Sequence, residues 1–132
     1  LTSAECGTDL ANASCQRLVD ETLVTYRTNL EQAMDRLVAA AGTARVLFLQ
    51  TYNPFSLGLG ESAQERESST MVSRLNAVAA EVASARGIAV ADGFTPLQGT
   101  TAATTHMLDA EPDIHPNAAG YDVLAGALVD AR

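Results

Sequence analysis

A histidine that follows an aspartate by two positions is the feature of this sequence best suited to chemistry. It lies in the stretch DIHPNAAGY, residues 113–121. Imidazole gains and loses a proton nearest neutral pH, so it commonly acts as a general acid or base. A carboxylate beside it can orient the ring and stabilise its charged form. The pattern predicts that His115 moves protons and that Asp113 orients it; the alternative is a solvated loop histidine beside a helix-capping acid.

Other ionisable residues near this stretch give weaker signals. We expect His106 to be an exposed loop histidine without a partner. Asp109, Glu111 and Asp113 alternate along the chain, as some calcium ligands do, but the central glycine and closing glutamate of an EF-hand are missing. We therefore expect no metal and no cofactor.

Two cysteines, Cys6 and Cys15, lie close together in a polar stretch. No histidine stands at metal-ligand spacing from them, which argues against zinc. The favoured interpretation is a local disulfide that closes a short loop, with two reduced thiols as the alternative. A disulfide would imply a secreted protein.

The composition excludes several kinds of partner. The chain has 132 residues, 47% of them hydrophobic, which is compatible with one packed domain. Its net charge is −8 and all eight of its basic residues are arginine. A basic surface for nucleic acid or for a membrane is therefore not expected. No stretch approaches the ~20 apolar residues of a transmembrane helix.

Periodic apolar residues predict helices that alternate with short strands. The first helix has apolar residues in steps of three and four, which form one stripe. Asn12 or Ser14 is its expected cap, and Gly42 its stop. The expected stripe consists of Val19, Leu23, Tyr26, Leu30, Met34 and Leu37. The expected helices are at about 15–41, 61–86 and 117 to the end, and the expected strands at 44–52 and 88–92. Residues 93–112 are expected to be a loop with at most one helical turn, and His115 is expected in a short loop before the last helix. We expect Tyr121, Leu124 and Leu128 on one face of the last helix.

The core of the first expected strand, residues 46–49, is apolar without alternation. Such a strand is typical of a parallel sheet covered by helices on both faces. A two-stranded sheet is only marginally stable alone. The fold class predicted is therefore α/β, as part of a larger doubly wound parallel sheet in three αβα layers. The loop at residues 55–60 follows the carboxyl end of this strand. Ligands of open parallel sheets bind at the carboxyl ends of the strands, so this loop is placed where it could contact a substrate; the alternative is an ordinary loop with a few apolar residues.

The stretch DIHPNAAGY resembles the last conserved block of the SGNH hydrolases, also called GDSL esterases and lipases. VLFLQTYNP at residues 46–54 is similar to that family's fourth strand and the turn after it, and GIAVAD at residues 87–92 to the strand before its histidine loop. The resemblance implies a flavodoxin-like fold and a secreted serine esterase that needs no cofactor. Its substrate would be a carboxylic ester of a lipid, a short acyl group or an acylated sugar.

By this resemblance His115 would be the general base, and then the acid that protonates the leaving alcohol. Asp113 would orient it. The family's usual acid stands three positions before the histidine, where this chain has Pro112. Either Asp113 takes over that role, or a backbone carbonyl orients the ring and leaves a Ser–His dyad.

The chain contains no Gly-Asp-Ser block and no Gly-x-Asn-Asp block. In the family these supply the nucleophile and oxyanion-hole donors. Residues 1–132 would then be the C-terminal half of one SGNH-like domain, inactive until an N-terminal half is supplied in cis or in trans. The alternative is a non-catalytic α/β interaction module or an inactive proteolytic fragment.

Overall fold

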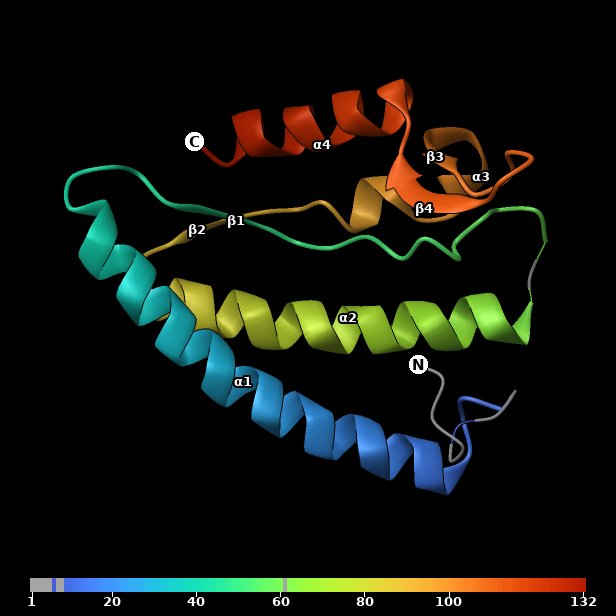
Figure 1. Cartoon of the computed structure of the whole chain (residues 1–132), viewed down its shortest axis with the longest axis horizontal. Coiled ribbons are helices and arrows are strands. Elements are labelled where there is room, and N and C mark those ends of the chain that lie inside the picture. Colours follow the sequence, from blue (N-terminus) through green and yellow to red (C-terminus); the bar gives the residue numbers. More distant parts are fainter. Residues whose placement is uncertain (1–5, 7–8, 61) are drawn as a thin grey trace.

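The computed structural model describes residue 6 and residues 9–60 and 62–132 (Figure 1). Its helices and strands alternate along most of the chain. In order they are α1 (Ala13–Ala41), β1 (Leu47–Leu49), α2 (Ala63–Ser84), β2 (Ala89–Ala91), the 3-10 helix η1 (Thr95–Leu97), α3 (Thr101–Thr104), β3 (Thr105–His106), β4 (Asp113–Pro116) and α4 (Ala118–Asp130).

Helices cover both faces of a small parallel sheet. Strands β1 and β2 pair in parallel, with Phe48 opposite Val90. Figure 1 shows α4 on one side of this pair and α2 on the other, with α1 packed against α2. The chain is therefore an α/β protein with a parallel pair of strands between helices. The described residues form two sheets of two strands each.

Each long helix begins at a side chain that accepts a hydrogen bond from the first turn. Asn12 Oδ1 accepts from the amide of Cys15 at 2.9 Å, Ser62 Oγ from that of Glu65 at 3.0 Å, and Asn117 Oδ1 from that of Gly120 at 3.2 Å. These oxygens satisfy amides that have no partner within the helix. Asn12 is thus the cap, rather than Ser14. Helix α1 ends at Gly42, as expected.

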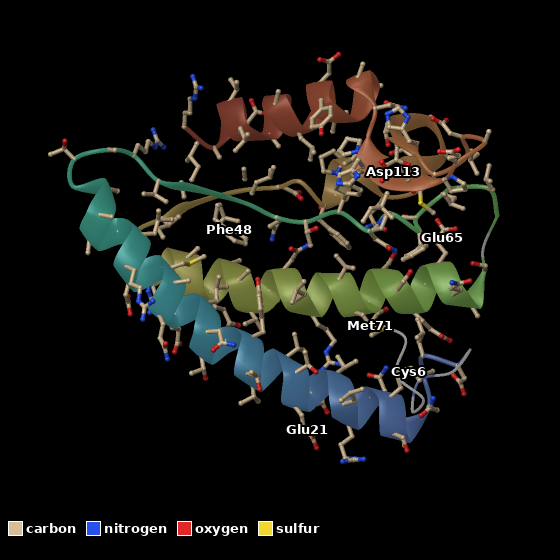
Figure 2. The ribbon with its side chains drawn as sticks, viewed as in Figure 1. Cys6, Glu21, Phe48, Glu65, Met71 and Asp113 are labelled. Carbon is tan, nitrogen blue, oxygen red and sulfur yellow. A yellow bond between two sulfur atoms is a disulfide. The ribbon has the colours of Figure 1, made fainter. Side chains whose placement is uncertain are left out.

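Two buried clusters hold the helices together. One contains the disulfide between Cys6 and Cys15, whose Cα atoms are 4.5 Å apart, packed with Val19 and Met71; Figure 2 labels Cys6 and Met71. This confirms the predicted pairing of the cysteines. The other cluster joins α1 and α2 to the strand pair. Its buried members are Met34, Val82, Ala83 and Ile88, with Phe48 and Val90 packed against them.

Two expectations about burial were wrong, and a third was met in part. Strand β1 has helices on both faces, as expected, but its residues are only half-buried, and β2 is the one strand that pairs with it among the described residues. Leu37 is 51% exposed. Met34, one turn earlier, packs against the last turn of α2, so the end of α1 extends beyond its partner helix. Tyr121 is 58% exposed, although Leu124 on the same helix is buried.

No helix in the described part of the chain combines the length and the apolar character needed to span a membrane.

Candidate active site

His115 was expected in a loop, but it lies in the short strand β4. Strand β4 pairs antiparallel with β3, with Thr105 opposite Pro116 and His106 opposite Asp113. The segment 93–112, expected to be a loop with at most one helical turn, contains η1, α3 and β3. The polar ribbon formed by β3 and β4 therefore carries the histidine next to the start of α4 (Figure 1).

The structure brings the two predicted site residues together. His115 Nδ1 lies 2.6 Å from Asp113 Oδ1, and the backbone amide of His115 donates to the same oxygen at 3.1 Å. Both side chains are largely exposed, at 70% for His115 and 51% for Asp113. The partner of the ring is thus the carboxylate two positions before it, rather than a backbone carbonyl.

These contacts determine which ring nitrogen is free to accept a proton. The backbone amide of His115, followed by its ring, holds the pKa of the Asp113 carboxyl below its ordinary value. An ionised carboxylate only accepts hydrogen bonds, so Nδ1 must carry the ring proton. In the neutral ring, Nε2 then carries the lone pair and can accept a proton from a hydroxyl. Nε2 makes no hydrogen bond to the part of the chain that the structure describes.

Asn117 secures the C-terminal side of His115. Its backbone N–H donates to Thr104 O at 3.1 Å. Its side-chain Nδ2 donates to Ala103 O at 2.9 Å and to Thr105 O at 3.2 Å. Gly120 packs closely against the backbone of Thr104: a Cβ added to Gly120 would lie 2.1 Å from Thr104 O. The close backbone approach that a glycine permits explains this residue at the start of α4.

A second His–Asp pair lies on the neighbouring strand. His106 Nδ1 is 2.8 Å from Asp109 Oδ2, so the expectation that His106 has no partner was wrong. The turn after β3 brings Asp109 back, because its amide donates to His106 O at 3.1 Å. Among the residues that the structure describes, no three His, Cys, Asp or Glu side chains converge in a way that could hold a metal ion.

None of the described serines is placed as a nucleophile for this histidine, since none hydrogen-bonds to His115. Ser56, in the loop after β1, is 2% exposed. Its Oγ lies 3.0 Å from Gln98 Oε1 and accepts from the amide of Gly99 at 2.8 Å. These contacts tie the loop to the segment before α3, which is a structural role.

The loop after β1 borders two hollows that do not reach the His–Asp pair. One, of about 430 Å³, is lined by apolar residues that include Phe55, Leu57 and Leu59. The other, of about 710 Å³, is lined mainly by small and polar residues such as Ser69. Neither Asp113 nor His115 lines either of these two hollows.

Asp92, at the end of β2, has a local structural role. Burial raises the pKa of its carboxyl, but hydrogen bonds from Thr95 and from the amide of Phe94 outweigh that effect, so the net pKa is lowered. The amides of Phe94 and Thr95 donate to its Oδ1 at 3.0 and 2.8 Å, where η1 begins.

The parallel pair β1–β2 between helices and the ribbon formed by β3 and β4 define an α/β protein that presents a His–Asp pair. The family model of the GDSL-like Lipase/Acylhydrolase family matches residues 6–123. The chain belongs to this family, as the sequence resemblance predicted. Comparison with curated proteins and with solved structures gave no match. Membership indicates hydrolase activity of the esterase or lipase type and an ester-type substrate.

Proposed function

We propose that this chain supplies the general base and its orienting acid to a serine esterase active site. The observation that carries the proposal is the 2.6 Å contact between His115 Nδ1 and Asp113 Oδ1, which leaves Nε2 as the proton acceptor. Family membership supports hydrolysis of an ester. The exposure of both side chains supports access by a substrate and by a nucleophile from another segment.

In the proposed reaction, His115 Nε2 takes the proton of a serine hydroxyl as the serine oxygen attacks the ester carbonyl. The charged ring then gives this proton to the leaving alcohol, and an acyl-serine remains. Water attacks the acyl group by the same route and regenerates the serine. Asp113 stabilises the charged ring and keeps the Nδ1 proton in place throughout.

The nucleophile is proposed to come from a Gly-Asp-Ser segment outside these 132 residues, in cis or in trans. The support is the lack of such a motif in the sequence and of any serine bonded to His115 among the described residues. That segment would add strands to the β1–β2 pair and complete a doubly wound, flavodoxin-like sheet. The disulfide between Cys6 and Cys15 supports secretion.

Hydrolysis of an activated ester, together with labelling by a fluorophosphonate, tests the proposal. The chain alone should neither hydrolyse the ester nor be labelled. The longer protein, or the chain mixed with a separately produced Gly-Asp-Ser segment, should do both, with the label on the serine of that segment. A label on one of this chain's own serines would contradict the proposal. Lack of hydrolysis by the completed protein would instead favour an interaction module.

A further inference from the structure

Tyr52 reaches the His–Asp pair from the end of the parallel sheet. Its hydroxyl donates to the carbonyl oxygen of Ile114 at 2.5 Å, across 62 positions of sequence. Ile114 stands between Asp113 and His115. We propose that Tyr52 is a positioning residue for His115, holding the backbone that keeps the ring on Asp113. This inference rests on the function proposed above.

The peptide unit between Ile114 and His115 is held from both sides. Tyr52 Oη binds its carbonyl oxygen, and Asp113 Oδ1 accepts its N–H at 3.1 Å. A peptide unit is planar, so contacts at its oxygen and at its N–H together set the orientation of the plane. That plane sets the direction in which the His115 side chain leaves the backbone, and therefore its approach to Asp113.

Burial does little to hold this segment. Asp113, Ile114 and His115 are all exposed, and Pro116 is the first buried residue of β4. The ties through Asn117 and Gly120 act after His115, on the side of α4. Before it, the chain from Leu108 to Pro112 is exposed. The hydroxyl of Tyr52 therefore acts, together with the pairing of Asp113 with His106, on the side of His115 that burial does not hold.

Tyr52 is itself well anchored. The preceding residue, Thr51, donates its amide to Asn76 Oδ1 at 3.0 Å, and its carbonyl accepts from Asn76 Nδ2 at 2.7 Å. Asn76 is a buried residue of α2. Burial, followed by the nearby Tyr121 and Asp113, raises the pKa of the Tyr52 hydroxyl, which therefore stays protonated as a donor. The connection runs from α2 through Thr51 and Tyr52, which follow β1, to the backbone before the histidine.

Nitrogen-15 NMR of the histidine rings in this chain tests the inference. In the unsubstituted chain, neutral His115 should carry its proton on Nδ1. Tyr52→Phe keeps the aromatic ring and removes the hydroxyl. The ratio of the Nδ1–H to the Nε2–H tautomer should then fall by about fivefold, the factor expected for one neutral hydrogen bond. Tyr26→Phe, at a half-buried tyrosine of α1, should leave this ratio unchanged.

The outcomes separate the two proposals. If His115 in the unsubstituted chain carries its proton on Nε2, the function proposed for the pair fails. If it carries the proton on Nδ1 and Tyr52→Phe leaves the ratio unaltered, only the role of Tyr52 fails. One measurement needs no substitution: the Tyr52 hydroxyl proton should exchange with water more slowly than that of the exposed Tyr121. Equal exchange rates would overturn the inference even if the variant failed to fold.

Discussion

Gly120→Ala should destabilise the fold and disturb the end of the β3–β4 ribbon at Pro116. The added Cβ would lie 2.1 Å from Thr104 O and 2.8 Å from Pro116 Cβ. To reach ordinary van der Waals contact, Thr104 O must move away from the new Cβ by more than about 1 Å and Pro116 Cβ by somewhat less. Thr104 O also accepts the amide of Asn117 at 3.1 Å, so that bond is strained as well. Overpacking of this kind costs about 1–3 kcal/mol.

Gly126→Ala is the matched control, because it makes the same change in the same helix. Apart from its chain neighbours and the backbone of its own helix, no atom of the described residues lies within 4 Å of a Cβ added there. Alanine is favoured over glycine inside a helix, so this variant should be about 0.5–1 kcal/mol more stable than the parent. Urea unfolding followed by circular dichroism gives both values. The reasoning is refuted if Gly120→Ala is as stable as the parent, or if both variants lose stability equally.

Three further predictions concern the site and its supports. The Asp113 carboxyl should titrate with a pKa below the ordinary aspartate value. In His115→Ala this pKa should rise only part of the way back, because the backbone amide at position 115 still donates to the carboxylate. Carboxyl ¹³C NMR measures the pKa in the parent and in the variant. Since the folded pKa is depressed, this contact stabilises the fold above the ordinary pKa, and the contribution is lost as pH falls through the lower folded value. A full return to the ordinary value would show that the ring alone causes the shift. Replacing Cys6 and Cys15 together by serine should cost about 2.5 kcal/mol in urea unfolding, the entropy of a loop of that length, and no loss would contradict the chain-entropy argument. Asn76→Leu should lower the free energy of unfolding by more than about 2 kcal/mol, since it leaves the backbone N–H and C=O of Thr51 without partners. A smaller loss would mean that water replaces the Asn76 amide.

Sequence reasoning predicted best those features that depend on neighbours along the chain. The order of the long helices follows from apolar periodicity, and the two parallel strands follow from short apolar runs. The polar residues Asn12 and Ser14 indicated where the first helix begins, and the structure chooses Asn12 as its cap. The disulfide follows from two nearby cysteines. The association of Asp113 with His115 is also local, since the residues are two positions apart. In each case the residues that form the contact also signal it.

The features that were missed depend on contacts between distant segments. Strand β3 has only two residues, Thr105–His106, too few for any alternation to be visible. Its pairing with β4 follows from the turn between them and from the ties through Asn117. The contact of Tyr52 with Ile114 spans 62 positions and has no local signal. Tyr121 fits a buried helical stripe by spacing, yet its side chain is 58% exposed.

The central claim is that His115, and not the other histidine, transfers the proton during ester hydrolysis. The direct test is the rate of activated-ester hydrolysis by the completed protein with His115→Ala and with His106→Ala. Both residues lie on one ribbon and contact an aspartate, at 2.6 and 2.8 Å respectively. We expect His115→Ala to lower the rate by about 10²–10⁴-fold, the usual contribution of a positioned acid–base group, and His106→Ala to leave it near the parent rate. A parent-like rate for His115→Ala, or an equal loss in both variants, would contradict the account.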